Sequence, residues 1–245
     1  MFDNVISWKT ITEKNAVVQL GNKGQPLPAK NGRTFFNYTR SFDGQASNRE
    51  IYDGVCQKTV QSFLKGTNGI IMTYGQTGSG KTYTMEGSYI DDEREGVLQM
   101  SARDIFQYIE TCNETASVHV SVFELYNQEI NDLIANESIS SLQDPKTRML
   151  VDLSEDIIPD FSSFLYLIDM INQRRKVRCT DMSQNSSRSH LIYKISFHNK
   201  SNDQSVDSTL FLVDLAGSDS SLRFVKKVKG GQQKQQNEAN YINKR

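Results

Sequence analysis

The chain is poor in the residues that mark several classes of protein. It has three cysteines and four prolines among 245 residues, and Cys56, Cys112 and Cys179 lie far apart with no C-x-x-C spacing. This arrangement argues against a disulfide framework or a zinc site and favours free thiols in a reducing compartment. The N-terminus lacks the basic stretch followed by an apolar core that is typical of a secretory signal.

Long apolar runs and an excess of one charge are also absent. No run approaches the roughly 20 residues that a membrane-spanning helix needs, so we expect no membrane insertion. The 28 basic and 29 acidic residues nearly balance, so net charge does not point to nucleic acid as a partner. A hydrophobic content of 37% suits a soluble globular protein, either one large α/β domain or two small ones.

The chain does have a glycine-rich loop with the full G-x-x-x-x-G-K-[ST] pattern. The loop consists of Gly75, Gln76, Thr77, Gly78, Ser79, Gly80, Lys81 and Thr82. Glycines let backbone N–H groups turn toward phosphate oxygens, Lys81 is placed to reach the β- and γ-phosphates, and the Thr82 hydroxyl to ligate Mg²⁺. The apolar run 69–74 before the loop has the length of a buried strand, and a helix can begin after Lys81. The pattern predicts a nucleoside triphosphate site.

Strand-like and helix-like patterns alternate around this loop. We predict strands at 16–20, 34–38, 69–74, 118–126, 150–153, 192–197 and 209–214, and helices at 48–64, 97–109 and 162–175. Ser47 or Asn48 is a candidate N-cap of the first helix, and the apolar run 209–214 is typical of a central strand buried on both faces. The alternation predicts an α/β fold with a central sheet flanked by helices. A basic cluster follows the last helix, which we interpret as a solvated helix end: Arg174, Arg175, Lys176 and Arg178.

Two further motifs accompany the loop. At the end of the strand 209–214, Asp214 begins a D-x-x-G motif, where a carboxylate belongs beside Mg²⁺ and the bare Gly217 backbone can approach a γ-phosphate. The segment 186–190 reads Ser-Ser-Arg-Ser-His, whose hydroxyls and guanidinium can bind metal and phosphate. Alone, this segment would be interpreted as a solvated turn or a phosphorylation target. Together, the three motifs predict a sensor of the γ-phosphate.

This combination of motifs closely resembles the kinesin motor domain. The resemblance is carried by Gly75–Met85, by S-S-R-S-H at 186–190 and by D-L-A-G-S at 214–218, and it runs from about Phe35 to Arg245. The segment Phe123–Leu133 is similar to the family's E-[IL]-Y-N-E-x-[IV]-x-D-L stretch, and Glu238–Lys244 to the start of its switch helix. The resemblance implies a P-loop NTPase fold with a mixed central sheet. In that fold, switch I would lie near 183–190 and switch II near 214–219. An extended basic loop would follow at 220–237, and the switch helix would begin at 238–245.

The resemblance also implies an ATP hydrolase that microtubules stimulate. Residues 75–82 would hold ATP, and Thr82, Ser187 and Asp214 would hold Mg²⁺. Ser186 would position the attacking water, Gly217 would contact the γ-phosphate, and Arg188 would pair with Asp219 to lock the switch loops. The implied partner is tubulin in microtubules, and the implied location is the cytoplasmic cytoskeleton. Neither nucleic acid nor an oligomeric state is indicated.

The chain departs from the family at several points. Asp219 stands where the family usually has Glu, so the pair with Arg188 must close across one methylene less, and we expect slower hydrolysis. Ser183 replaces a usual Asn. The family's opening R-x-R-P strand and the elements after the switch helix have no counterpart, which predicts a partial motor domain, 1–245, with an exposed hydrophobic sheet edge.

These departures leave two alternatives open. In the first, the chain is either a working motor or a truncated, non-motile module that binds nucleotide or partners without productive hydrolysis. The second concerns the basic loop 220–237, which either steers association with acidic microtubules or is a solvated loop. Its basic residues are Arg223, Lys226, Lys227, Lys229 and Lys234.

Overall fold

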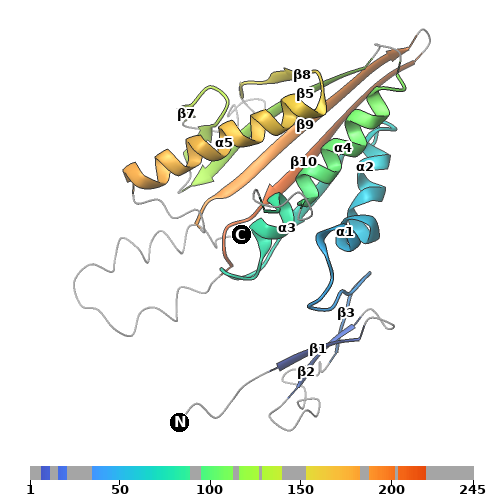
Figure 1. Ribbon diagram of the computed structural model, residues 1–245, viewed down its shortest axis with the longest axis vertical. Coiled ribbons are helices and arrows are strands. Elements are labelled where there is room, and N and C mark those ends of the chain that lie inside the picture. Colours follow the sequence, from blue (N-terminus) through green and yellow to red (C-terminus); the bar gives the residue numbers. More distant parts are fainter. Residues whose placement is uncertain are drawn as a thin grey trace, which may run out of the picture. The chain divides into compact units, whose positions relative to one another are not determined.

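Figure 1 shows the fold of the chain as a computed structural model. The structure describes residues 7–11, 16–20, 35–88, 95–112, 116–126, 129–139, 153–182, 188–201 and 204–218. The chain divides into two compact units, Met1–Cys56 and Gln57–Arg245. The predicted strand at 150–153, apart from Leu153, and the predicted loop and helix over 220–245 lie outside the described residues.

The first unit contains a small antiparallel sheet. Its strands are β1 (Ser7–Ile11), β2 (Ala16–Leu20) and β3 (Phe35–Asn37), in the order β1-β2-β3. The strands predicted at 16–20 and 34–38 are therefore confirmed. β1 was not predicted, because its two large apolar residues, Trp8 and Ile11, do not follow the two-residue period of a half-buried strand.

A helical run extends from the first unit into the second along the chain. It consists of α1 (Asn48–Ile51), a π-helical turn η3 (Tyr52–Cys56) and α2 (Gln57–Phe63), which confirms the predicted helix over 48–64. Ser47 is its N-cap: Ser47 Oγ accepts a hydrogen bond from the Glu50 N–H at 3.2 Å, and Glu50 Oε2 accepts one from the Ser47 N–H at 2.8 Å. This reciprocal pair satisfies two backbone donors that a helix start otherwise leaves open.

The second unit is built on a seven-stranded mixed sheet with the order β4-β10-β9-β5-β6-β7, and β8 pairs with β5. β10 pairs in parallel with β4 and antiparallel with β9. The strands are β4 (Gly69–Thr73), β5 (Ala116–Tyr126), β6 (Glu129–Asp132), β7 (Glu137–Ile139), β8 (Asp156–Ile158), β9 (His190–Ser201) and β10 (Gln204–Asp214). The predicted strands at 69–74, 118–126, 192–197 and 209–214 are confirmed, and the short β6, β7 and β8 were missed.

Helices of the second unit pack on one face of this sheet (Figure 1). They are α2, α3 (Lys81–Glu86), α4 (Val97–Ile109) and α5 (Phe161–Met182). The ring of Phe197 on β9 lies 5.9 Å from that of Phe63 on α2 and 6.1 Å from that of Tyr108 on α4. The core of the unit therefore lies between this helical layer and the sheet. Among the described helices, none combines the length and the apolar character that crossing a membrane requires.

The opposite face of the sheet is less well covered. Leu210 and Leu212 of β10 are fully buried, whereas Phe211 and Val213, which point the other way, are half-buried. On the neighbouring β4, Ile70 and Met72 are 59% and 55% exposed. β10 is an inner strand as predicted, but its predicted burial on both faces is wrong, because the described helices cover only one face.

Helix α5 is longer than the sequence indicated. It was predicted to end near Arg175 but continues to Met182. The interpretation of the basic cluster as a solvated helix end is wrong for its first two members. Arg174 Nη1 donates hydrogen bonds to the carbonyl oxygens of Leu133 and Ile134, both at 2.5 Å, and the Arg175 side chain is 11% exposed. Arg174 therefore contacts the turn between β6 and β7, and Arg175 contacts the carboxylates of Glu86 and Glu124.

Candidate functional site

The predicted phosphate loop joins β4 to α3. Gly78 and Gly80 have φ of 78° and 90°, in the left-handed region that favours glycine. A Cβ on Gly75 would lie 2.6 Å from Ser79 Oγ, so a larger residue there would have to displace the Ser79 side chain. Residues 76–80 are exposed, and no atom of the described residues lies within 4 Å of a Cβ built on Gly78 or Gly80. The glycines therefore give the loop its path and leave its outer side open.

Lys81 lies against this loop. Its Nζ donates a hydrogen bond to the carbonyl oxygen of Gln76 at 3.0 Å, and the same carbonyl accepts the Ser79 N–H at 3.2 Å. The Lys81 side chain is half-buried, although residues 76–80 are exposed. The ammonium group is therefore held at the loop.

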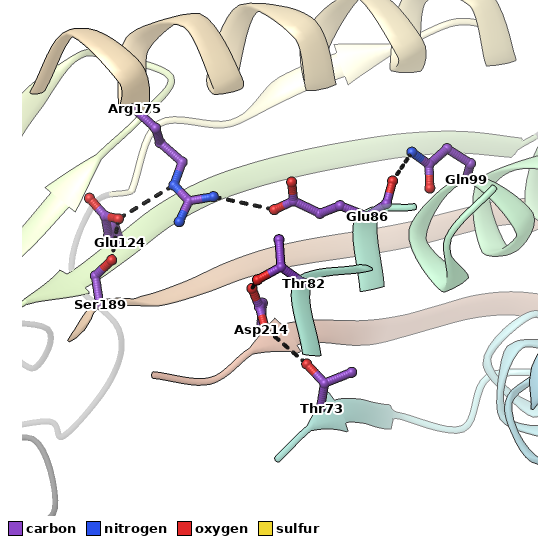
Figure 2. Close-up of polar contacts among 8 residues, drawn as sticks. All are labelled: Thr73, Thr82, Glu86, Gln99, Glu124, Arg175, Ser189 and Asp214. Carbon is purple, nitrogen blue, oxygen red and sulfur yellow. Dashed lines mark hydrogen bonds and ion pairs between the residues drawn. The ribbon is translucent and has the colours of Figure 1, made fainter. Parts of the chain in front are cut away.

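The carboxylate of Asp214 joins the loop helix to two strands (Figure 2). Thr82 Oγ1 donates to Asp214 Oδ2 at 2.6 Å, and Thr73 Oγ1 donates to Asp214 Oδ1 at 3.0 Å. Asp214 is 6% exposed, whereas Thr82 is exposed. Asp214 and Thr73 are register partners at the ends of β10 and β4. The parallel pairing of these strands therefore brings together two residues predicted to hold Mg²⁺, Thr82 and Asp214.

The D-L-A-G-S stretch contacts both other motifs. The Ser218 N–H donates to the carbonyl oxygen of Gly75 at 3.0 Å, and the Ala216 N–H donates to His190 Nδ1 at 3.1 Å. His190 is the last residue of the S-S-R-S-H segment and the first of β9. The three motifs, which are far apart in the sequence, thus meet at one edge of the sheet.

Several predicted site residues lie outside the described residues. These are Ser183, Ser186, Ser187 and Asp219. Arg188 is described and half-buried, and Gly217 is buried. The pairing of Arg188 with Asp219 and the roles of the two serines therefore stay predictions.

The structure adds a buried ionic cluster that the sequence analysis missed (Figure 2). Arg175 Nη1 contacts Glu86 Oε1 at 3.3 Å, and Arg175 Nε contacts Glu124 Oε1 at 3.4 Å. Burial lowers the pKa of the Arg175 guanidinium, but the charges of Glu86 and Glu124, with smaller contributions from Tyr193 and Asp214, more than offset this effect and the net pKa is raised. One signal could have revealed the cluster: Glu124 is a carboxylate inside a strongly apolar strand, where a partner is required.

The residues at the loop fit a magnesium nucleotide. Among the described residues, no three His, Cys, Asp or Glu side chains gather to hold a metal by themselves. Mg²⁺ usually takes only one or two carboxylates and completes its shell with water and substrate phosphates. The Asp214 carboxylate beside the exposed Thr82 hydroxyl is a donor set of this kind, and the open side of the glycine loop leaves room for phosphate.

Comparison with known proteins agrees with this arrangement. The sequence profile of the kinesin motor domain matches residues 6–245. Kinesin-1 heavy chain of Homo sapiens is 35% identical over 191 residues, which are 75% of this chain and 20% of that protein. Kinesin-like protein KIN-7N of Arabidopsis thaliana is 36% identical over 212 residues, which are 83% of this chain and 25% of that protein. The chain thus spans a quarter or less of the length of these relatives.

A solved kinesin structure has the same fold. The structure of a fast kinesin, described for its ATPase mechanism and its interactions with microtubules, matches with a TM-score of 0.79 and 28% sequence identity. The match covers 97% of this chain and 65% of that one. The profile, the relatives and the structure lead to one conclusion: the chain belongs to the kinesin motor-domain family and has a P-loop NTPase fold, with a mixed central sheet and flanking helices.

Proposed function

We propose that the chain binds Mg·ATP at the phosphate loop and hydrolyses it as part of a microtubule motor. One contact carries the proposal, the 2.6 Å hydrogen bond from Thr82 Oγ1 to Asp214 Oδ2 at the start of α3. It joins the last residue of the G-x-x-x-x-G-K-T loop to the first residue of D-L-A-G. These are two of the three residues that the family resemblance implies for Mg²⁺, the third being Ser187.

Phosphoryl transfer depends mainly on positioning and on stabilisation of charge. The backbone N–H groups of the loop and Lys81 would bind the β- and γ-phosphates. Thr82, Ser187 and Asp214 would hold Mg²⁺, and the Thr82 hydroxyl is hydrogen-bonded to the Asp214 carboxylate. When bound, Mg²⁺ supplies positive charge against the phosphate oxygens.

The two switch segments would complete the site. Ser186 would orient the attacking water, and the Gly217 N–H would contact the γ-phosphate. Arg188 would pair with Asp219 and so hold the segments together around the nucleotide. The contact of Ala216 with His190 supports this scheme, because it already joins the two segments just beside these residues.

Microtubule binding and a location on the cytoplasmic cytoskeleton are proposed from membership of the family. Tubulin would be the partner of the switch helix at 238–245, and the basic loop 220–237 would steer association with its acidic surface. A second candidate function is a truncated, non-motile module that binds nucleotide or partners without productive hydrolysis. Asp219 favours this candidate, because its side chain is one methylene shorter than the family's usual Glu and so reaches less far toward Arg188.

Steady-state ATP hydrolysis with and without microtubules tests the proposal. We expect turnover that rises with microtubules and falls by about 10²–10³-fold in Lys81→Ala, the range for losing a group that stabilises transition-state charge. Lys65→Ala removes an exposed lysine at the opposite end of β4 and should behave as wild type. ATP binding without stimulated turnover would favour the non-motile module, and absence of ATP binding would overturn the proposed hydrolysis.

A further inference from the structure

The buried cluster of Arg175, Glu86, Glu124 and Ser189 has no part in the hydrolysis proposed above. Its members come from α5, α3, β5 and the residue before β9 (Figure 2). Glu86, Glu124 and Ser189 are 3%, 4% and 6% exposed. Burying charged groups is costly, and apolar residues of similar volume often stabilise a protein as well or better. The location of the cluster therefore needs an explanation beyond stability.

One oxygen of Glu124 receives two donors. Ser189 Oγ donates to Glu124 Oε1 at 2.5 Å, and Arg175 Nε donates to the same oxygen at 3.4 Å. Arg175 Nη1 also donates to Glu86 Oε1 at 3.3 Å. Ser189 directly follows Arg188 in the chain, so a continuous series of contacts leads from the S-S-R-S-H segment to Glu86.

Glu86 is the last residue of α3, the helix that begins with Lys81 and Thr82. Its carbonyl oxygen accepts a hydrogen bond from Gln99 Nε2 at 2.6 Å, which holds this end of the helix to α4. The series of contacts therefore relates the segment around Arg188 to the helix that carries two residues of the phosphate site. α3 has six residues, so a rise of about 1.5 Å per residue places Glu86 only about 8 Å along the helix from Lys81.

Ser189 and His190 fix the same short segment in different ways. Ser189 is bound to the cluster, whereas His190 accepts the Ala216 N–H of the D-L-A-G stretch. Both contacts lie within two residues of Arg188, so each restrains Arg188 with respect to the rest of the site. A displacement of about 1 Å can lower a rate by about 10²-fold when the reaction depends on positioning.

We infer that Glu124 and Arg175 are positioning residues, which hold Ser189, and with it Arg188, in place relative to α3. The catalytic consequence of this inference rests on the proposed ATP hydrolysis. The holding itself is a property of the chain without nucleotide, so it can be measured separately.

Ser189→Ala tests the inference, because it removes one hydroxyl and leaves the ion pairs intact. Ser196→Ala is a matched control: Ser196 is a 5% exposed serine on β9 whose Oγ also faces a carboxylate, Glu155 Oε1 at 3.5 Å. In the nucleotide-free chain, we expect amide hydrogen exchange at residues 188–191 to rise about fivefold in Ser189→Ala, as for the loss of one hydrogen bond. Ser196→Ala should leave exchange there unchanged.

Kinetics distinguish positioning from a merely structural role. In Ser189→Ala we expect kcat to fall by about 10-fold or more while the KM for ATP stays within about twofold, because the residue does not bind the substrate. Glu124→Gln keeps an acceptor for Ser189 but loses the negative charge that faces Arg175, and it should therefore also lower kcat. Ser196→Ala should change neither constant.

The outcomes separate the two proposals. Faster exchange with a lower kcat supports the inference, and faster exchange with an unchanged kcat overturns it. Unchanged exchange in Ser189→Ala overturns it as well. If the wild-type chain binds Mg·ATP but does not turn it over, the proposed hydrolysis fails, and exchange alone then decides whether the cluster holds the segment.

Discussion

Two polar clusters lie at the two ends of helix α3, and they differ in what faces their carboxylates. At the start of the helix, Asp214 accepts hydrogen bonds from the hydroxyls of Thr82 and Thr73. At its end, Glu86 and Glu124 share the guanidinium of Arg175. Hydroxyl groups satisfy hydrogen bonds without neutralising charge, whereas the guanidinium does both.

The cluster at Asp214 can therefore accept a cation, whereas the cluster at Glu86 and Glu124 already contains one, the guanidinium of Arg175. Thr82 is exposed, so a metal ion can reach the first cluster. The second cluster is closed, with an Arg175 side chain that is 11% exposed. The first is therefore suited to binding, and the second to holding neighbouring elements in place. Substitutions in the two clusters should affect different measurements.

The largest effect on activity is expected at the open cluster. Asp214→Asn removes the negative charge and should lower ATP hydrolysis by about 10²–10³-fold, as for loss of a group that supports charge in the transition state. Asp207→Asn on the same strand changes a side chain that is 59% exposed, and should have no such effect. Equal rates for Asp214→Asn and wild type, measured at saturating Mg²⁺ and ATP, would contradict the assignment.

The closed cluster should instead dominate stability. Arg175→Met leaves Glu86 and Glu124 buried without their cation, and should lower the free energy of unfolding by about 3–5 kcal/mol. Arg103→Met is the control, because Arg103 pairs with Glu95 at the surface and such pairs contribute about 0–1 kcal/mol. Urea denaturation measures both. Similar losses for the two variants would show that burial of the cluster has no special importance.

A smaller effect is expected from the backbone of the phosphate loop. Gly78→Ala forces an L-residue into a left-handed conformation, which costs about 1–2 kcal/mol although the space around the Cβ is open. Gly44→Ala is the matched control, since Gly44 also has open space and lacks a positive φ. An unfolding free energy of Gly78→Ala equal to that of Gly44→Ala would mean that the loop relaxes without cost.

The smallest effect concerns the start of α5, the helix that carries Arg175. The Ser163 N–H donates to Asp160 Oδ1 at 2.7 Å, and this backbone hydrogen bond holds the pKa of Asp160 below its usual range. The stabilisation is present above the unfolded-state pKa of about 3.9 and is lost as the pH falls through the lower, folded-state pKa. Asp160→Ala should therefore lower the urea midpoint slightly at pH 7 and progressively less in acid. A difference that is independent of pH would contradict this account.

The sequence predicted the open cluster and missed the closed one for a physical reason. Thr82 and Asp214 lie 132 residues apart, but each belongs to a motif whose chemistry requires the other. Arg175 lies 89 residues from Glu86 and 51 from Glu124, and its neighbours Arg174 and Lys176 give it the local pattern of a solvated helix end. Nothing in that pattern shows that α5 continues and turns Arg175 toward the sheet.

Secondary structure was predictable where periodicity was strong. Helix α4 matches its predicted range, 97–109, because its apolar residues follow a helical period and Gly96 precedes it. The short strands β6, β7 and β8 have three or four residues each, too few for a period to be recognised. They form through pairing with β5 and with one another, which only the folded sheet provides.

The Mg²⁺ dependence of ATP binding tests the central claim most directly. ATP affinity would be measured by calorimetry, with and without Mg²⁺, for the wild-type chain and for Thr82→Val, which keeps the shape of the side chain but removes the hydroxyl. The account predicts that Mg²⁺ tightens ATP binding strongly in the wild type and much less in Thr82→Val. Binding that is absent, or equally dependent on Mg²⁺ in both proteins, would contradict the claim that Thr82 and Asp214 form the cation site.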